Sequence, residues 1–521
     1  MKLGDHASDI CRYIQDPIHG TIALSKLECS VIDHPVMQRL RQIRQLGNAS
    51  LIFPGATHTR FCHAIGVMHQ AGELFAALTR PFVDGKQGRP VSARVRRALA
   101  QVQQRVRLAG LLHDVGHGPF SHHFEHVLEE SDTRVSSLSG TGLAVPLTWI
   151  QMRSRAAYLE EPLRHEHFSA ALIASLGLDE GLTRAILSLL DTRFLSGPAM
   201  EEDLRCLADA AGAPQAAWSS LLDCLRSLIS SEIDADRMDY LRRDAYFCGV
   251  NVGFDAAHLV RSLTLTHEER RFYIAVEPNA VFALEQLLLA RKQMFSQVYQ
   301  NRANLLLDHL LSLAMAHLTA HGQLAVPRSV GEFLQLDDTS IMQALRGLVR
   351  DREVNATPDR QGDLALKMYL TRCLPVTLAT MDVPASDWTK LSRSLRKRWP
   401  RSEILVSPAK DLLGGHDDKA HQDGPLSQRG RRPRISRIVT QHGKRGRFVP
   451  VAEASELVRS KAWRFSAYRI VVTKSLFDSA RERQLDDRLT ALVAESQPTS
   501  SLRLVMMGAG GSTGTARGRG R

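Results

Sequence analysis

The sequence has no long apolar run and few cysteines. Its 521 residues contain no uninterrupted apolar stretch near the ~18–20 residues that cross a bilayer, which argues against a transmembrane helix. The first residues, MKLGDHASDICRY, lack the apolar core of a signal peptide. The seven cysteines are scattered and form no CxxC pair, so neither a zinc finger nor a disulfide scaffold is expected. We therefore expect a cytoplasmic protein with reduced thiols.

The net charge of +12 is concentrated in two places. Eight basic residues and no acidic residue lie between 429 and 447, and the last five residues, RGRGR, add three arginines. Without these charges the rest of the chain carries about +1. Both stretches adjoin segments that are too polar to bury a core, so we expect a solvated linker and tail. At most a weak nucleic-acid contact is expected through them.

Most of the first 350 residues show apolar residues at the i, i+3, i+4 spacing of amphipathic helices. The segments with this pattern are 93–113, 165–178, 182–190, 216–233 and 278–318. Asp255, before AAHLVRSL, is typical of a helix N-cap. Strand-like runs are few, at 270–276, 402–407, 435–441 and 466–473. The fold class is therefore mainly α, a helical bundle with at most one hairpin and a smaller α+β C-terminal lobe.

The expected domains follow one another along the chain. A core spans 1–330, and a polar segment at 129–160 within it is expected to form a flap. The later parts are a helical or α+β extension at 331–407, a flexible linker at 408–434, a C-terminal α+β lobe at 435–500 and a disordered basic tail at 501–521.

Histidines and carboxylates gather in one short segment. The sequence HDVGHGPFSHHFEH at 113–126 contains five histidines and two carboxylates. Buried histidines and carboxylates are costly unless they are paired or bound to metal, so packing alone does not explain this density. Consecutive residues at a helix end diverge by only about 100°, so His113 and Asp114 can point at one ion. His63, in TRFCHAIG, and Asp236, in EIDADRMDY, are further candidates.

Taken singly, these further candidates have simpler explanations. A histidine such as His63 on an amphipathic helix is more often a packed residue, and Asp236 before Arg-Met-Asp-Tyr fits an ion-pair partner. Together, two imidazoles and two carboxylates suit Fe, Mn, Zn, Co or Ni better than Ca or Mg. Such a site leaves positions for water and a phosphate oxygen.

The order His63…His113-Asp114…Asp236 resembles the H…HD…D signature of the HD-domain metal phosphohydrolases. The chain is similar in particular to the deoxynucleoside triphosphate triphosphohydrolases, in the branch of the SAM-and-HD-domain-containing enzyme, here without a SAM domain. The resemblance covers 12–320, and 435–480 is similar to that branch's C-terminal lobe. Its segments are DPIHGTIALS (16–25), VIDHPVMQRLRQIRQLG (31–47), FPGATHTRFCHAIGVMHQAG (53–72), AGLLHDVGHGPFSH (109–122), IDADRMDYLRRDAYFCG (233–249) and VYQNRAN (298–304).

The resemblance implies a reaction and a metal. The reaction is hydrolysis of a dNTP to deoxynucleoside and tripolyphosphate by water attack at the α-phosphorus. The implied metal ligands are His63, His113, Asp114 and Asp236. A divalent transition metal neutralises phosphate charge there, and Mg accompanies the substrate triphosphate.

Catalytic residues are implied by the same resemblance. His122 and Glu125 match a His–carboxylate dyad in which His122 donates a proton or activates water and Glu125 orients its imidazole. His117 and His165 match positions that line the phosphates. His167, two residues after His165 in RHEH, competes for that role, and the sequence leaves the choice open.

Substrate recognition has its own matches. The implied positions are Gln45 and Asp244 near the 3′-hydroxyl, Tyr240 and Tyr299 against the sugar, and Arg60, Arg291 and Arg302 facing the triphosphate. A tyrosine against C2′ leaves no space for a 2′-hydroxyl, so ribonucleotides are excluded sterically. Guanidinium groups suit phosphate oxygens because they donate in pairs.

A second nucleotide site is implied near the N-terminus. Arg12, Asp33, Gln38 and Arg41 match positions that form a guanine-nucleotide activator pocket between subunits in this branch. A carboxylate and an amide can pair with a guanine edge while arginines take phosphates. The alternative is a surface ion-pair cluster. The implied assembly is a homo-oligomer, with a tetramer favoured, activated by GTP or a dNTP.

Two other functions stay open at this stage. One is a different HD phosphohydrolase or phosphodiesterase, which acts on nucleoside monophosphates, cyclic nucleotides or guanosine tetraphosphate. The matched sugar and arginine positions argue against it, because a smaller substrate would not require them. The other is a nucleic-acid-binding, defence-associated protein that uses the basic 429–447 segment and the tail.

Overall fold

The fold is known from a computed structural model, which describes part of the chain. The described residues are 10–83, 91–268, 270–354, 366, 369–370, 377–384, 404–407, 438–442, 447–450, 455, 467–473 and 504–506. Two compact units emerge: a first unit of 1–294, 321–344 and 423–463, and a second unit of 295–320, 345–422 and 464–521. The linker expected at 408–434 lies outside the described residues, as does most of the expected tail.

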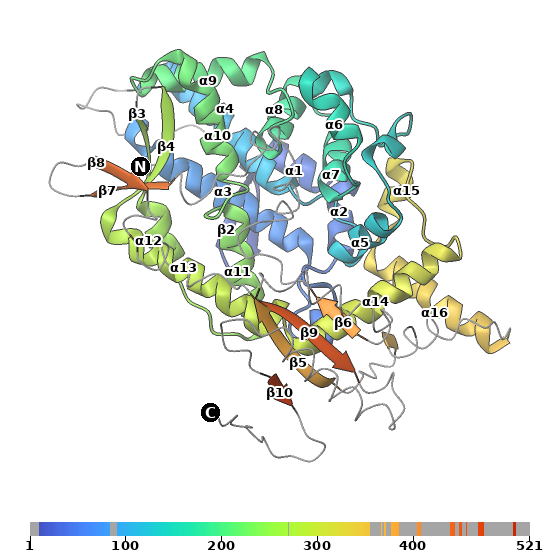
Figure 1. Ribbon diagram of the computed structural model, residues 1–521. Helices are drawn as coiled ribbons and strands as arrows, with labels where there is room; N and C mark the ends of the chain where they lie inside the picture. The colour runs from blue at the N-terminus through green and yellow to red at the C-terminus, as the bar shows by residue number, and fades with distance from the viewer. Residues whose placement is uncertain are drawn as a thin grey trace, which may run out of the picture. The chain divides into compact units, whose positions relative to one another are not determined.

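The first unit is built mainly of helices (Figure 1). They are α1 (Lys26–Ile32), α2 (Pro35–Gln38), α3 (Arg60–Val83), α4 (Ala93–Leu112), α5 (His122–Glu130), α6 (Arg155–Leu159), α7 (His165–Ala174), α8 (Glu180–Leu190), α9 (Pro198–Ala210), α10 (Trp218–Ser227), α11 (Ala235–Cys248), α12 (Ala256–Arg261), α13 (Val281–Met294) and α15 (Val330–Leu334). Helix α14 (Arg302–Ala320) belongs to the second unit, and α16 (Asp338–Val354) begins in the first.

Three small sheets accompany the helices in the part of the chain that the structure describes. The first unit has the antiparallel hairpin β1 (Ile10–Asp16) and β2 (Gly20–Ser25), and a sheet in the order β3 (Leu263–Glu268), β4 (Arg271–Val276), β7 (Ile438–His442), β8 (Arg447–Pro450). The second unit has a sheet in the order β10 (Leu504–Met506), β5 (Thr377–Pro384), β9 (Ala467–Thr473), β6 (Ile404–Ser407). The predicted class, mainly α with a smaller α+β part, is confirmed.

The structure also corrects particular expectations. The periodic segment 278–318 is not one helix, because a π-helical turn at Phe295–Tyr299 separates α13 from α14. The hairpin β1–β2 was not expected, since most of β1 is exposed and shows little apolar alternation. Asp255 caps α12 as expected, and its side chain accepts a hydrogen bond from the backbone N–H of His258.

The strands expected in one C-terminal lobe lie in two different sheets. Strand β7 pairs in parallel with β4, with Ile438 opposite Ile274, whereas β9 pairs with β5 and β6. The physical reason lies in β4, which is largely buried: without a further strand, the backbone N–H and C=O groups along its open edge would be unpaired.

The segment expected as a flap at 129–160 carries short helices and its own apolar side chains. Val135, Leu138, Leu143, Ile150 and Tyr158 are buried. Its role as a moving lid stays a prediction.

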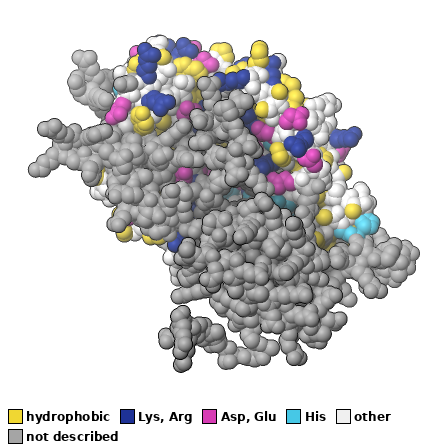
Figure 2. Space-filling view, in the orientation of Figure 1, with side chains coloured by type: hydrophobic (Ala, Val, Ile, Leu, Met, Phe, Trp, Pro, Cys, Tyr) yellow, Lys and Arg dark blue, Asp and Glu magenta, His cyan; other side chains and the backbone are white. Residues whose placement is uncertain are grey.

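The visible described surface mixes charges of both signs. Figure 2 shows Lys and Arg side chains interspersed with Asp and Glu on this face. Within the described ranges, no helix is both long and apolar enough to span a membrane.

Helix α3 packs against α4 and α11, and glycines permit the close approach. A Cβ on Gly66 of α3 would lie 2.0 Å from Asp239 Oδ1 and 2.4 Å from an Arg243 guanidinium nitrogen, both on α11. These side chains are buried and held by each other, so they cannot move aside cheaply. The glycine therefore sets the spacing of two helices that carry functional candidates.

We expect Gly66→Ala to destabilise the protein by about 1–3 kcal/mol or more, as overpacking does elsewhere. The matched control is Gly347→Ala in α16, where a Cβ meets nothing within 4 Å and a gain in stability is expected. Thermal unfolding of the two variants checks this. Equal melting temperatures would contradict the close approach at Gly66.

Candidate functional site

The four expected metal ligands come together in the first unit. His63 lies on α3, His113 and Asp114 follow the last turn of α4, and Asp236 lies on α11. His63 Nε2 is 3.1 Å from Asp236 Oδ1 and 3.9 Å from Asp114 Oδ2. His113 Nε2 is 3.3 Å from Asp114 Oδ1 and 3.7 Å from Asp236 Oδ1. Helices far apart in sequence thus bring His63, His113 and Asp114 into one group, with Asp236 beside both imidazoles.

The imidazoles of His63 and His113 are oriented for metal binding. His63 Nδ1 lies 2.8 Å from Asp239 Oδ2, and His113 Nδ1 lies 2.8 Å from the carbonyl oxygen of Gly110. Carboxylate and carbonyl oxygens accept hydrogen bonds, so the Nδ1 atoms donate and each Nε2 is the atom through which a neutral imidazole would bind a metal. Both Nε2 atoms are buried without a hydrogen-bond partner among the described residues. His63, His113 and Asp114 therefore form a group able to hold a divalent metal.

Charge favours a cation at this point. Burial opposes the imidazolium of His63, but Asp236 and Asp239 outweigh it and raise the pKa of His63 to about 10. Burial likewise opposes the carboxylate of Asp236, yet the imidazoles of His113 and His63 hold its pKa below the usual value. A metal ion would compete with protons for the same nitrogen atoms.

A buried ionic network supports His63 from behind. Asp239 is fully buried, and its carboxylate accepts the hydrogen bond from His63 Nδ1. The same carboxylate lies 2.6 Å from His19 Nε2 and accepts from two guanidinium nitrogens of Arg243, both at 2.8 Å. Arg243, also fully buried, reaches Asp16 at 2.9 Å and 3.2 Å. The sequence reading missed this network.

A second cluster is centred on the buried carboxylate of Glu125. Its Oε1 lies 2.8 Å from His165 Nδ1, 3.0 Å from His122 Nδ1 and 3.6 Å from His117 Nδ1. The rings of His117 and His165 stack with centroids 3.8 Å apart. His117 Nε2 lies 3.4 Å from Asp114 Oδ1, which joins this cluster to the metal group.

The stacked imidazoles carry different charges. Burial disfavours a proton on His165, but Glu166 and Glu125 outweigh it and raise the pKa of His165 to about 9. Burial and the nearby charges of Arg60 and His165 hold the pKa of His117 well below its usual value. Near neutral pH these shifts favour the protonated form of His165 and the neutral form of His117.

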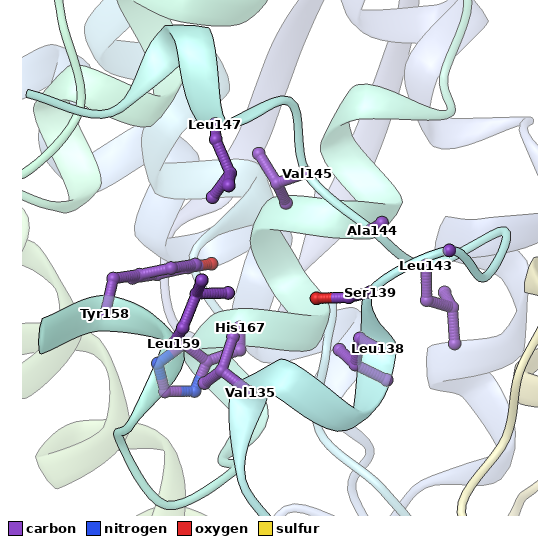
Figure 3. Close-up of a pocket in the computed structure, with 11 residues that line it drawn as sticks. Val135, Leu138, Ser139, Leu143, Ala144, Val145, Leu147, Tyr158, Leu159 and His167 are labelled. Atoms are coloured by element: carbon purple, nitrogen blue, oxygen red, sulfur yellow. The ribbon is translucent and has the colours of Figure 1, made fainter. Parts of the chain in front are cut away.

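The structure separates His165 from its competitor His167. His167 Nδ1 accepts a hydrogen bond from the backbone N–H of Arg164 at 3.1 Å, and its Nε2 lies 3.1 Å from Glu161 Oε2. Its ring stands beside Tyr158 on the wall of a different, largely apolar cavity of about 170 Å³ (Figure 3). Only His165 of the pair lies in the Glu125 cluster.

Among the residues expected to bind substrate, Arg60 touches the metal group directly. Its guanidinium forms an ion pair with Asp114, and its Nε donates to Ser121 Oγ at 2.9 Å. Arg291 on α13 is buried, and burial lowers its pKa to about 10, with Arg237 contributing and Tyr240 opposing.

The positions expected near the sugar also adjoin one another. Asp244, one helical turn after Tyr240 on α11, pairs with His58 through a 2.8 Å contact from Oδ1 to Nε2. Gln45 donates its backbone N–H to the His58 carbonyl oxygen at 3.0 Å. His58 was missed, although ATHTRFCH places it two residues before Arg60. Tyr299 and Arg302 belong to the second unit, so their relation to this site stays a prediction.

The four residues expected to bind an activator form two hydrogen-bonded pairs, Arg12 with Asp33 and Gln38 with Arg41. Arg12 on β1 donates to both oxygens of Asp33 at 2.9 Å and 2.7 Å, and this pair is exposed. Arg41 Nε donates to Gln38 Oε1 at 2.8 Å, and the Arg41 guanidinium lies 3.7 Å from the centre of the Phe61 ring. This arrangement fits a nucleotide site and a plain ion-pair cluster alike.

Two family models match the chain in succession. The HD domain model matches residues 60–241, and the HD associated region model matches 254–360. The first match runs from the start of α3 into α11 and contains the four expected metal ligands.

Curated relatives include enzymes and uncharacterized proteins. The deoxynucleoside triphosphate triphosphohydrolase SAMHD1 of Xenopus laevis is 28% identical over 338 residues, which are 61% of this chain and 47% of that protein. Its human counterpart is 29% identical over 313 residues, 58% and 44% of the two chains. An uncharacterized Bacillus subtilis protein is 32% identical over 290 residues, which are 55% of this chain and 51% of that protein. The chain spans about half the length of these relatives.

Solved structures share the fold. A hypothetical protein from Aquifex aeolicus is 25% identical, with a TM-score of 0.55 over 92% of this chain and 99% of that one. A phosphohydrolase from Bacteroides thetaiotaomicron is 21% identical, with a TM-score of 0.56 over 89% and 100%, a likeness of fold alone. The chain thus contains an HD domain followed by an HD-associated region, and SAMHD1-type triphosphohydrolases are among its homologues.

Proposed function

We propose that this chain hydrolyses deoxynucleoside triphosphates to deoxynucleoside and tripolyphosphate in a metal-dependent reaction. The observation that carries the proposal is the contact between the two clusters. At this junction Asp114 Oδ1 of the metal group lies 3.4 Å from Nε2 of His117, which belongs to the Glu125 cluster. A phosphate held at this junction would meet a metal and an acid–base group together. The SAMHD1 relatives, named as deoxynucleoside triphosphate triphosphohydrolases, support the substrate class.

The proposed metal is a divalent transition ion such as Fe, Mn, Zn, Co or Ni, held by His63, His113, Asp114 and Asp236. When bound, it would neutralise phosphate charge and make water at the phosphorus a better nucleophile. The donor set of two nitrogens and two carboxylates suits these ions, and Mg would accompany the triphosphate.

His122 is the proposed proton donor. Release of tripolyphosphate requires the bond between the α-phosphorus and the 5′-oxygen to break, so that oxygen must gain a proton. Glu125 accepts from His122 Nδ1, and we propose Nε2 of the same ring as the atom that exchanges protons with substrate or water. The His122 side chain is 43% exposed, whereas Glu125 is buried, so the acid is accessible and its partner is shielded.

Positive groups around the junction suit a tetra-anionic substrate. Arg60 pairs with Asp114 at the junction, and protonated His165 lies against Glu125. A triphosphate oxygen arriving between them would gain charge-assisted hydrogen bonds. We propose Arg291, Arg302, Tyr240, Tyr299, Gln45 and Asp244 as further substrate contacts.

The decisive experiment incubates the protein with Mn²⁺ or Fe²⁺ and each dNTP, with and without GTP, and separates the products by chromatography. Tripolyphosphate and deoxynucleoside are expected, whereas pyrophosphate or orthophosphate would refute cleavage of the bond between the α-phosphorus and the 5′-oxygen and favour another HD phosphohydrolase. Asp236→Ala should lower activity by more than about 100-fold, because even residues that only support metal ligands cost 10–100-fold. Asp209→Ala, an exposed change on α9, is the control. Full activity in Asp236→Ala would remove that carboxylate from the metal site.

The raised pKa of His165 predicts a pH dependence. Its folded pKa of about 9 exceeds the ordinary 6.5, so the stabilising charge is fully present below pH 6.5 and is lost as pH rises through 9. Activity and thermal stability should therefore fall through that window. Glu166→Gln removes one carboxylate that holds the proton, so both declines should begin at lower pH. Glu180→Gln, at an exposed pair on α8, should keep the wild-type profile, and a Glu166→Gln profile identical to it would refute the assignment.

We also propose that Arg12, Asp33, Gln38 and Arg41 bind a GTP or dNTP activator in a homo-oligomer. Mass photometry should show nucleotide-driven assembly, with a tetramer as the largest species. Asp33→Ala should abolish that assembly, whereas Asp223→Ala, which breaks another exposed arginine–aspartate pair, should not. A monomer with and without nucleotide would contradict the proposal.

A further inference from the structure

The turn that leads into α5 has an unfavourable backbone. Phe120 has φ 52° and Ser121 has φ 60°, both in the left-handed region that non-glycine residues rarely occupy. Each such residue costs about 1–3 kcal/mol unless its surroundings hold it. His122, the proposed proton donor, is the next residue and the first of α5. The position of the acid therefore depends on whatever holds this turn.

A carboxylate from the HD-associated region holds it. Asp338, which begins α16 and is buried, accepts the backbone N–H of Phe120 on Oδ1 at 2.7 Å. Its Oδ2 accepts the backbone N–H of Arg44 at 3.0 Å. One side chain thus joins two backbone segments that border the site.

These contacts continue to the metal group. Ser121 Oγ donates to the Arg44 carbonyl oxygen at 3.4 Å and accepts from Arg60 Nε at 2.9 Å. Arg60 in turn pairs with Asp114. Asp338 is therefore linked through the turn to a proposed metal ligand on one side and to His122 on the other.

Arg39 supplies a second support from the same region. Its NH1 donates to the His117 carbonyl oxygen and its Nε to the Leu336 carbonyl oxygen, both at 2.8 Å. Its guanidinium stacks 4.3 Å from the centre of the Phe333 ring. We call Asp338 and the Arg39–Leu336 contact the brace. It fixes the catalytic segment at His117 and at Phe120.

We propose that the brace positions the acid–base cluster for catalysis, with Asp338 as its principal positioning residue. Through the brace, the HD-associated region would support the HD site from behind, in addition to any substrate contacts that the same region makes. The catalytic consequence rests on the proposed function, whereas the structural consequence does not.

The carboxylate is required because it faces two donors. An aspartate accepts from the N–H groups of Phe120 and Arg44 at once, whereas an asparagine of the same shape presents one oxygen and one NH₂ group. Asp338→Asn would therefore set a donor against a donor and release one backbone segment. Asp337→Asn is the matched control, since Asp337 Oδ1 accepts only from Ser340 N in the described structure and an asparagine keeps that oxygen.

The kinetic test compares the wild type with these two variants on the dNTP that is hydrolysed fastest. Asp338→Asn should lower kcat about 10- to 100-fold, the effect of a displacement near 1 Å at a catalytic group. KM and bound metal, measured by elemental analysis, should stay unchanged because the two hydrogen bonds of the Asp338 side chain go to Phe120 and Arg44 and not to a proposed metal ligand. Asp337→Asn should match the wild type. Equal kcat values, or equal losses in both variants, would overturn the catalytic role.

A second readout needs no activity. Amide hydrogen exchange in the peptide 118–126 should be faster in Asp338→Asn than in the wild type and in Asp337→Asn. Arg39→Lys keeps the charge but cannot donate to both carbonyl oxygens as the guanidinium does, so it should also speed hydrogen exchange in this peptide. This variant tests the brace even where Asp338→Asn does not fold. Unchanged exchange in the folded variants would overturn the brace. If the wild type hydrolyses no dNTP, the proposed function fails, and this readout still decides whether the brace exists.

Discussion

The site depends on the buried pairing of Asp239 with Arg243. Burial would raise the pKa of the Asp239 carboxyl, but Arg243 and the imidazoles of His19 and His63 hold it well below its usual range. Removing one partner of such a buried pair typically costs about 3–5 kcal/mol, because a charge is left without compensation. The pair also fixes the tautomer and the ring of His63. The stability of the fold and the orientation of the proposed metal ligand His63 therefore both depend on this ion pair. A side chain at Gly66 would collide with it.

The sequence predicted those parts of the site that depend on the residue types and on their spacing along the chain. HD at a helix end, together with a distant histidine and aspartate, indicated a metal group, and the structure brings these four residues together. Asp239 was not recognised, because its spacing from Asp236 places both near one face of α11 but does not reveal that α3 packs there. Asp338 had no sequence signature, since its importance comes from backbone groups of Phe120 and Arg44.

The fold shows the same division between local and distant information. Helical periodicity predicted the bundle, and the cap at Asp255 was correct, because both depend on neighbouring residues. The break after α13 and the hairpin β1–β2 were missed. The destination of the C-terminal strands was also unpredictable, because pairing partners are chosen by an unfilled sheet edge rather than by a strand's own composition.

The parallel pairing of β4 with β7 has a consequence for how the chain folds. Ile274 of β4 pairs with Ile438 of β7. The sheet that contains β3 and β4 is therefore completed by a strand that is synthesised long after the helices of the first unit. During synthesis, α14, β5 and β6 leave the ribosome before β7 does. The backbone groups on this edge of β4 therefore stay unpaired through that interval, and contacts of such long sequence separation form slowly. Expression at low temperature or with a chaperone that covers strand edges should thus favour native protein over aggregate.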